Sequence, residues 1–527
     1  MKEYAKIRLV AVCALLVLVM AVFDSTIMQA QNVVTWHNDN SRTGQNVKET
    51  NLTTVNVNST QFGKKFSLAV DQQIYAQPLF VSNLSIPGKG THNVVFVATE
   101  NDSVYAFDGN GQPKTPLWHV NFTNAGNGIT AVPCRDNGGC AISTVIGITG
   151  TPVIDGTSKT MYQVSFTKEN GTYVQRLHAL DITTGAEKFG GPVVIQASVP
   201  GTGSGSMNAT VTFQALRQNQ RPGLLLLNGV VYIAWASFGD IDPYHGWVMG
   251  YSASTLAQVS VYNNTANGSR GGIWQGAAGL SADTKGNIYA ISGNGTFDAD
   301  VGGVDYGDSF IKLSTTSGLS VSDYFTPFNQ SMLEIEDLDL GSATGLIPPK
   351  QAGSFPNEII SAGKQGVIYV VNRDNMGQFN SNMNNVIQTV TGASGGYLAS
   401  PAYWNGGMYF SGVGDFVSLY SLSNGLLSNT PLSRSATTYR LGSNPSVSAN
   451  GTTNGILWAI DVVAPKATGV LHAYDATNLA TELYNTTQNS TRDSLGIAVK
   501  FSSPTIIRGR VYVGTSNALV VYGLLAH

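Results

Sequence analysis

Residues 77–108 read QPLFVSNLSIPGKGTHNVVFVATENDSVYAFD. A polar residue and a proline start this stretch, an apolar run follows, and two further apolar runs, residues 94–97 and 104–107, come after polar turns. Short runs that are rich in Val, Phe and Tyr and are bounded by Gly, Asn and Pro are typical of β-strands. The stretch therefore predicts antiparallel strands joined by tight turns, with Asp108 at its end.

The same pattern recurs along the chain, eight times in all. The second copy begins at Thr151-Pro152 and ends at Asp181, and the later copies end near residues 249–251, 311–313, 369–372, 418–420, 472–475 and 520–522. The separation between copies suffices for four short strands and their turns, which is the size of one β-propeller blade. We therefore predict an all-β fold, an eight-bladed β-propeller of four-stranded antiparallel blades.

The last copy starts at Ser503-Pro504 and ends close to the C-terminus. A strand from the N-terminal part of the chain, around Lys65 to Ala69, is expected to complete the last blade. Closure of this kind leaves no long sheet edge exposed. Residues 31–527 are therefore expected to form one propeller domain.

The composition suits a large β-protein and narrows the class of partners. Of the 527 residues, 42% are hydrophobic and only 12% are charged, so the chain is able to build a large core. The 59 glycines exceed the average share of about 7% and favour tight turns. Because 29 Lys and Arg stand against 32 Asp and Glu, with no basic stretch, nucleic acid is not expected as a partner.

The N-terminus has the features of a secretory signal peptide. Lys2 and Lys6 precede an apolar run over residues 9–23, and Ala30 provides a small residue at the expected cleavage point. The run is shorter than the roughly 20 apolar residues that span a bilayer, and a retained signal anchor is the alternative. We expect residues 1–30 to be removed, and the mature protein to be secreted or periplasmic with no membrane span.

Removal of the signal peptide leaves two cysteines, Cys134 and Cys140, with five residues between them. In an oxidising compartment such a pair is expected to form a disulfide that closes a small loop. A metal site is the alternative, but it needs further ligands nearby, and the sequence shows none there. The sequence has no Cys-x-x-Cys-His motif, so no covalently attached haem is implied.

The repeat resembles that of the quinoprotein alcohol dehydrogenase-like β-propellers, and the middle of the chain is also similar to them locally. The local matches are residues 272–275 (GIWQ), 286–289 (GNIY), 292–295 (SGNG), 306–309 (YGDS), 363–366 (GKQG) and 372–373 (NR). Enzymes of this family hold pyrroloquinoline quinone (PQQ) and calcium on the propeller axis. The resemblance therefore implies both cofactors and the oxidation of an alcohol or sugar.

Trp274 and Asn294 lie in these matched segments. The resemblance implies that Trp274 stacks on the quinone and that the side-chain oxygen of Asn294 binds calcium, a cation that prefers oxygen ligands. Each residue also has a structural explanation. A propeller tryptophan often wedges between blades, and an asparagine between Gly293 and Gly295 is common in a turn.

The loop around Asp240 resembles the one in which the family places a calcium-binding Glu and, a few residues later, an Arg. Here Asp240 stands in place of the Glu, and His245 stands in place of the Arg. Asp240 is therefore implied as a metal ligand whose reach is one methylene shorter, and His245 as a donor to a quinone oxygen. A solvent-facing acid and a structural histidine are the alternatives.

The family's catalytic base lies in a segment that corresponds here to residues 336–342, EDLDLGS. Asp339 is implied as the base and as a metal ligand, with Asp337 as the alternative base, although the Trp and His of the family pattern are missing. In the family mechanism the base takes the hydroxyl proton while hydride moves to the quinone. Lys364 is implied to hold the negative charge of the reduced quinone, unless it is an exposed turn lysine.

Two functions from different classes follow. The first is an exported quinoprotein dehydrogenase that passes electrons to a separate acceptor, and it requires Asp240, Trp274, Asn294, Asp339 and Lys364 to meet at one end of the propeller axis. The spaced cysteine pair, in place of the two adjacent cysteines common in these enzymes, counts against it. The second is a non-catalytic scaffold for binding protein or glycan, as in the outer-membrane assembly lipoproteins with similar repeats.

Overall fold

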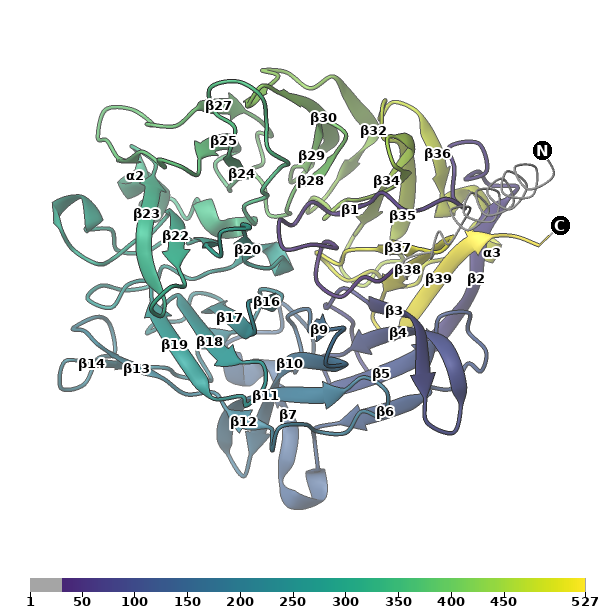
Figure 1. Cartoon of the computed structure of the whole chain (residues 1–527), viewed down its shortest axis with the longest axis horizontal. Coiled ribbons are helices and arrows are strands. Elements are labelled where there is room, and N and C mark those ends of the chain that lie inside the picture. The colour runs from purple at the N-terminus through teal and green to yellow at the C-terminus, as the bar shows by residue number, and fades with distance from the viewer. Residues whose placement is uncertain (1–30, 527) are drawn as a thin grey trace, which may run out of the picture.

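The computed structural model describes residues 31–526. Figure 1 shows a ring of β-sheets around a central axis, in which the N-terminal strand β2 (Phe62–Ala69) lies beside the C-terminal strand β39 (Ala518–Leu524). The segment predicted as a signal peptide, residues 1–30, lies outside the described residues. In the described part of the chain no helix is both long and apolar enough to cross a membrane.

Eight mainly antiparallel sheets form the blades, which confirms the predicted fold. From the axis outward, the strands of blades 1 to 4 are β3 (Leu79–Ile86), β4 (Gly90–Ala98), β5 (Ser103–Asp108) and β6 (Trp118–Asn121); β9 (Val153–Asp155), β10 (Thr160–Glu169), β11 (Thr172–Asp181) and β12 (Val193–Val194); β16 (Leu225–Leu227), β17 (Val230–Ser237), β18 (Trp247–Ser252) and β19 (Gln258–Asn263); and β20 (Ser281–Ala282), β21 (Ile288–Ile291), β22 (Phe310–Ser314) and β23 (Ser320–Thr326). Those of blades 5 to 8 are β24 (Glu358–Ala362), β25 (Val367–Asn372) and β27 (Gln388–Thr391); β28 (Ala402–Trp404), β29 (Gly407–Ser411), β30 (Asp415–Ser423) and β32 (Ser433–Tyr439); β33 (Ser446–Asn450), β34 (Thr453–Asp461), β35 (Val470–Asp475) and β36 (Glu482–Asn485); and β37 (Thr505–Ile507), β38 (Arg510–Gly514), β39 and β2.

Short elements decorate this ring. They are the strands β1 (Gln45–Asn46), β7 (Ile129–Pro133), β8 (Val145–Ile146), β13 (Ser198–Pro200), β14 (Thr210–Thr212), β15 (Gln218–Asn219), β26 (Gln378–Phe379) and β31 (Leu426–Leu427), the helices α2 (Gln330–Ile335) and α3 (Ser490–Asp493), and the 3₁₀ turns η1 (Ala125–Asn127), η2 (Cys134–Asn137), η3 (Gln275–Ala277), η4 (Ala299–Val301), η5 (Leu340–Ser342) and η6 (Thr486–Asn489). None of them forms a second layer, so the blades alone set the architecture.

Each of the eight predicted copies ends on the third strand of its blade, which explains why the repeat is visible in the sequence. In blade 5 the innermost strand is reduced to a single bridge between Leu346 and Ile360. The first two copies are far apart because the hairpin β7–β8 is inserted between them, and β7 pairs with the end of β10. The turn of this hairpin contains the predicted disulfide between Cys134 and Cys140, here called the disulfide loop.

The ring is closed by β2, as predicted. Strand β2 pairs antiparallel with β39, from Phe62 opposite Leu524 to Ala69 opposite Ala518. Phe62 is fully buried, and its ring centre lies 5.5 Å from that of Trp458 in blade 7. Burial of such a side chain contributes about 1.5–3 kcal/mol of stability. The two ends of the described chain therefore share one blade.

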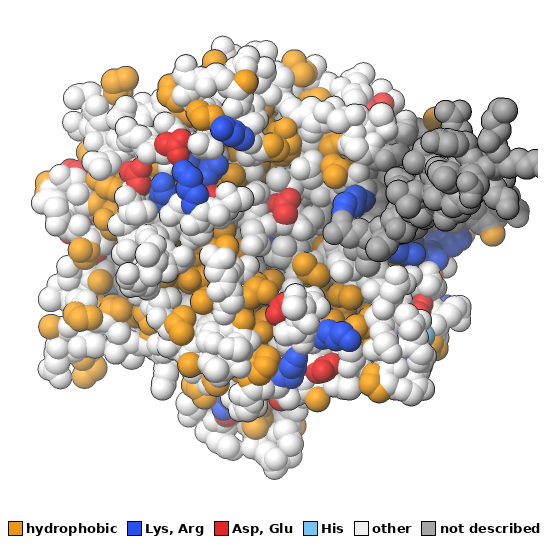
Figure 2. All heavy atoms as spheres, viewed as in Figure 1, with side chains coloured by type: hydrophobic (Ala, Val, Ile, Leu, Met, Phe, Trp, Pro, Cys, Tyr) orange, Lys and Arg blue, Asp and Glu red, His pale blue; other side chains and the backbone are white. Residues whose placement is uncertain are grey.

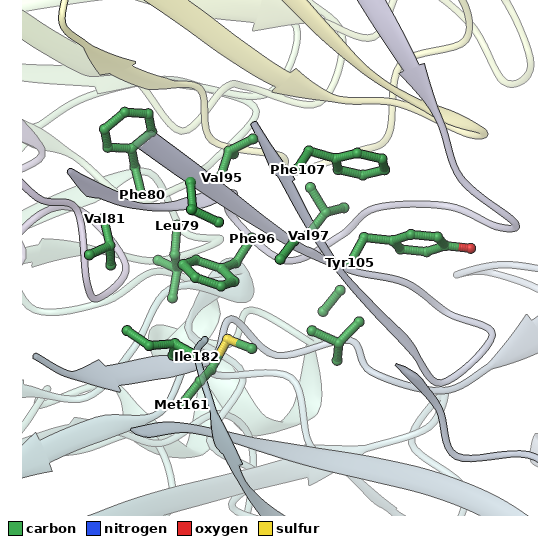
Figure 3. Packing of buried hydrophobic residues seen from close by; sticks show 14 of the residues in the cluster. Leu79, Phe80, Val81, Val95, Phe96, Val97, Tyr105, Phe107, Met161 and Ile182 are labelled. Atoms are coloured by element: carbon green, nitrogen blue, oxygen red, sulfur yellow. The ribbon is translucent and has the colours of Figure 1, made fainter. Parts of the chain in front are cut away.

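The core consists of contacts between neighbouring blades. Figure 3 shows Leu79 and Phe96 from blade 1 near Met161 and Ile182 from blade 2, and all four are at most 2% exposed. Phe80, which follows Leu79 in the same strand, packs instead against blade 8. Successive residues of a strand point to opposite faces of the sheet. One inner strand therefore joins its blade to both neighbours.

Residues 33–44, here called the axial segment, run through the middle of the ring (Figure 1). Ile154 of blade 2 and Tyr403 of blade 6 each donate a backbone hydrogen bond of 2.8 Å to this segment. Arg42 within it is fully buried, and its Nε donates to the carbonyl of Leu280 near blade 4 at 2.8 Å. The axial segment thus supplies backbone partners for inner strand edges that would otherwise be unpaired.

Figure 2 shows the face seen in Figure 1 as a surface, on which most side chains are uncharged and the charged ones lie in small groups. This distribution agrees with the low charged fraction of the sequence, 12%.

Candidate functional site

A cavity lies on the axis, where the loops before the inner strands of blades 3 to 8 meet. It has two adjoining chambers with Arg221, Trp274 and Lys500 as common wall residues, and their volumes are about 260 Å³ and about 360 Å³. The smaller, here called the carboxylate chamber, is also lined by Asp240, Gly276, Asp339, Ser342, Lys364, Leu398, Leu441 and Phe501. The larger, here called the disulfide-loop chamber, is also lined by residues 137–139, 141, 142, 146, 219, 237–239 and 241.

Asp339, the predicted base, is held by two groups. Lys364 Nζ lies 2.6 Å from Asp339 Oδ2, and the backbone N–H of Asn294 donates to Asp339 Oδ1 at 2.8 Å. Asp337 joins the same network, because its Oδ1 accepts from Lys364 Nζ and from Asn294 Nδ2, at 2.9 Å each. The Asp339 side chain is 9% exposed, whereas that of Asp337 is 70% exposed. Asp339 is therefore the buried member of the pair.

The surroundings of Asp339 make it a stronger base than an ordinary carboxylate. Burial raises the pKa of Asp339, and the charge of Asp240 adds to this, whereas Lys364 and the N–H of Asn294 lower it. Burial opposes the charge on Lys364, but the two carboxylates outweigh this cost and raise the pKa of its ammonium. Lys364 is thus cationic at neutral pH and favours the ionised form of Asp339.

Trp274 is half-buried between the two chambers and close to Asp339. A Cβ placed on Gly293 would collide with the Asp339 carboxylate and lie 3.1 Å from the Trp274 ring. Gly276, two residues after Trp274, has a φ of 56°, and a Cβ there would collide with the Leu398 carbonyl. Glycine is therefore required in the turn that positions the indole. The indole N–H is buried and has no hydrogen-bond partner among the described residues.

Asp240 lies on an exposed loop that borders the carboxylate chamber. Its Oδ1 accepts hydrogen bonds from Tyr244 Oη at 2.8 Å and from Ser237 Oγ at 3.2 Å. The charge of Asp240 contributes to the raised pKa of Asp339, so the two carboxylates interact electrostatically.

His245 is apart from this group. Its ring nitrogens lie 3.0 Å from Thr265 Oγ1 and 2.9 Å from the Ser204 carbonyl, and the residue is 3% exposed. His245 lines neither chamber. Burial lowers its pKa, which leaves the ring neutral at pH 7. These contacts suit the structural role that was the alternative for this histidine.

The oxygen atoms near Asp339 are of the kind that a hard divalent cation binds. Asn294 Oδ1 is buried, and no described residue donates a hydrogen bond to it. With the carboxylates of Asp339 and Asp240 it offers ligands from three residues, fewer than the roughly 6–8 that calcium takes. Among residues 31–526, no three His, Cys, Asp or Glu side chains form a ready metal-binding group. The candidate set therefore depends on the Asn294 amide and on oxygen atoms from water or a bound ligand.

Three lining residues, Arg221, Lys500 and Phe501, were not predicted from the sequence. One signal was present, because Arg221-Pro222 occupies the place of the polar residue and proline that begin other copies, such as Gln77-Pro78 and Thr151-Pro152. A charged side chain in that position lies at the start of an inner strand and therefore close to the axis. Lys500 and Phe501 belong to no repeated motif.

Solved structures with similar folds include several dehydrogenases. A quinohemoprotein alcohol dehydrogenase from Comamonas testosteroni superposes with a TM-score of 0.59 and 12% identity, over 93% of this chain and 80% of that chain. A quinohemoprotein alcohol dehydrogenase from Pseudomonas putida HK5 has a TM-score of 0.61 and 11% identity, over 94% and 81% of the two chains. A europium-containing methanol dehydrogenase has a TM-score of 0.61 and 12% identity, over 94% and 98%.

Neither a protein-family model nor a curated protein sequence matches the chain. At 11–12% identity, the likeness to the dehydrogenases concerns the fold. The chain thus has the eight-bladed propeller fold of the quinoprotein alcohol dehydrogenases, as its repeat predicted.

Proposed function

We propose that this chain is an exported quinoprotein dehydrogenase that binds PQQ and calcium in the axial cavity and oxidises an alcohol or sugar. The observation that carries the proposal is the convergence of Asp240, Trp274, Asn294, Asp339 and Lys364, which come from loops of three blades, on the carboxylate chamber. A scaffold would not require this convergence. The fold shared with alcohol and methanol dehydrogenases supports the same interpretation.

The cavity suits a flat aromatic ligand. Trp274 offers an aromatic face and an unpaired N–H at the wall between the chambers, and the disulfide loop lines the larger chamber. When bound, the quinone supplies the carbon that accepts hydride, and calcium makes that carbon more electrophilic. The protein's part is to hold the ligand and to handle the proton.

Asp339 is the group proposed to take the substrate's hydroxyl proton. It lines the carboxylate chamber, and its raised pKa brings its proton affinity closer to neutral pH than that of an exposed aspartate. Lys364 keeps Asp339 ionised and offers a positive charge to a ligand oxygen that becomes negative. Asp337 shares Lys364 with Asp339 and is largely exposed, so it links the pair to solvent.

Asn294, Asp240 and Asp339 are the residues that would hold calcium. The unpaired Asn294 Oδ1 accounts for why a buried amide oxygen lacks a donor in the protein alone. Asp339 would then serve both the cation and the proton, because Lys364 Nζ already lies 2.6 Å from its Oδ2.

The direct test uses the purified mature protein, incubated with calcium and PQQ. The expected result is absorbance of bound quinone after gel filtration and reduction of an electron-accepting dye with a panel of alcohols and sugars. A parallel sample with a calcium chelator is expected to lose dye reduction. If the folded wild-type protein neither retains quinone nor reduces the dye, the dehydrogenase proposal fails and the scaffold function is favoured.

Export and a separate electron acceptor are parts of the same proposal. Residues 1–30 have the composition of a signal peptide, and the sequence carries no haem-attachment motif. Mass spectrometry of the protein recovered from the culture medium or periplasm is expected to give an N-terminus at Gln31. Recovery of only the full-length chain, in the membrane fraction, would instead support the signal-anchor alternative.

A further inference from the structure

The wall between the two chambers carries a buried cation without a polar partner. Arg221 is 6% exposed, and its guanidinium forms no hydrogen bond or ion pair with any residue in the described range 31–526. It rests against two aromatic rings, 6.0 Å from the centre of Tyr75 and 5.1 Å from the centre of Phe501. Aromatic faces stabilise the cation but leave its N–H donors unused.

The acid that interacts with Arg221 does not neutralise it fully. Burial raises the pKa of Glu100 to about 7, so this carboxyl is only partly ionised at neutral pH. Its Oε2 already accepts hydrogen bonds from Gly147 N at 3.0 Å and Thr149 Oγ1 at 3.1 Å. The charge of Arg221 therefore remains available to a ligand in the cavity.

Lys500 places a second positive charge in the same wall. It lines both chambers, and its Nζ lies 5.9 Å from the centre of the Phe501 ring. Burial lowers the pKa of Lys500 to about 8, and the charges of Arg221 and Arg440 act in the same direction. Like charges in a partly buried wall disfavour the folded state unless an anion compensates them. Compensation by a ligand is the arrangement that an anion-binding site requires.

We propose that Arg221 and Lys500 form a binding site for an organic carboxylate in the wall shared by the two chambers. The arginine fork matches the two oxygens of a carboxylate, and the lysine adds a point charge. The carboxylate belongs either to an aromatic cofactor or to an acidic sugar or hydroxy acid, and the chemistry of recognition is the same for both. The site does not require turnover, so its test is independent of the proposed oxidation.

The test is calorimetric titration of the whole mature protein at pH 7 in a buffer with a metal chelator. Three probes are used: isophthalate, a flat aromatic dicarboxylate; gluconate, an acidic polyol; and sorbitol, a neutral polyol of similar size. We expect at least one acidic probe to bind and sorbitol not to bind. Preference for isophthalate identifies a cofactor carboxylate as the natural ligand, and preference for gluconate identifies an acidic substrate.

Substitutions then separate this wall from general charge effects. Arg221→Gln and Lys500→Gln are each expected to weaken binding of the acidic probe about tenfold, and Lys500→Arg to retain most of the affinity. Lys285→Gln is the matched control, because this lysine is 74% exposed and lines neither chamber. Lys500 is only half-buried, so Lys500→Gln remains informative if Arg221→Gln does not fold.

A pH series distinguishes a ligand contact from a structural role. Affinity for the acidic probe is expected to fall between pH 7 and pH 9 as Lys500 loses its proton, and this fall is expected to be absent in Lys500→Arg. The other titratable groups near the wall, Glu100 and Tyr75, are unchanged in that variant, so the difference reports Lys500. Absence of binding by both acidic probes, or equal affinity in wild type and the folded Gln variants, would overturn the proposal.

Discussion

Lys364 bridges two carboxylates of very different exposure, with its Nζ 2.6 Å from Asp339 Oδ2 and 2.9 Å from Asp337 Oδ1. Only Asp339 lines the chamber, and only Asp339 also accepts a backbone hydrogen bond from Asn294. The two aspartates are therefore not equivalent, although the sequence alone left the choice between them open.

Asp339→Asn is expected to reduce the rate of dye reduction about 10²–10⁴-fold at saturating calcium and PQQ, because a general base contributes that much. Asp337→Asn is expected to reduce the rate less than about tenfold, since its side chain is 70% exposed and lines neither chamber. Steady-state rates of the two variants, prepared in parallel, provide the measurement. Equal losses would contradict the assignment of the base.

Trp274→Ala is expected to weaken PQQ binding about 3–10-fold, which corresponds to the contribution of aromatic stacking. Trp274→Phe keeps an aromatic face and is expected to retain most of the affinity. Titration of quinone absorbance measures both variants. If Trp274→Ala binds PQQ as tightly as the wild type while its stability falls, the tryptophan is a wedge between blades rather than a stacking partner.

Replacement of both Cys134 and Cys140 by Ser is expected to lower the free energy of unfolding by about 2 kcal/mol, the value for a disulfide that closes so small a loop. The same variant is expected to bind PQQ more weakly, because the disulfide loop lines the larger chamber. Urea unfolding and quinone titration measure the two effects. Reduction of the wild type with dithiothreitol should reproduce both, and a change in neither would show that the disulfide loop keeps its shape without the bond.

Glu100→Gln is expected to change how stability depends on pH. The pKa of Glu100 is about 7 in the folded protein against an ordinary value of 4.5, so the folded state holds this proton more tightly than the unfolded state. Stability of the wild type therefore falls as pH rises through that interval, by up to about 3 kcal/mol between pH 5 and pH 8. The variant should lack this component in urea unfolding at the two pH values, whereas the exposed control Asp300→Asn should keep it.

Phe62→Ala is expected to lower the free energy of unfolding by about 3–5 kcal/mol, because it leaves a cavity where β2 completes the last blade. Lys65→Ala, on the exposed face of the same strand, is expected to change it by no more than about 0.5 kcal/mol. Chemical denaturation followed by circular dichroism compares the two. Similar effects would mean that closure depends on backbone pairing rather than on the buried ring.

The number of blades and their closure were predictable because they depend on local patterns. Alternation of apolar residues marks each third strand, and the run around Lys65 to Ala69 has no partner until the last copy supplies one. The cavity was predictable only where a family resemblance pointed to it, as for Trp274. Arg221 and Lys500 meet because the ring brings distant loops to the axis, and strand periodicity holds no information about such contacts.

The axial segment also has a consequence for how the chain folds. Backbone groups of residues 33–44 find their partners near Ile154, Tyr403 and Val447, so the first described residues cannot be satisfied until most of the polypeptide is in place. Contacts of such large sequence separation slow folding, because a long loop must close before they form. The ring is therefore expected to mature late and cooperatively, and loss of a terminal strand should destabilise every blade rather than one.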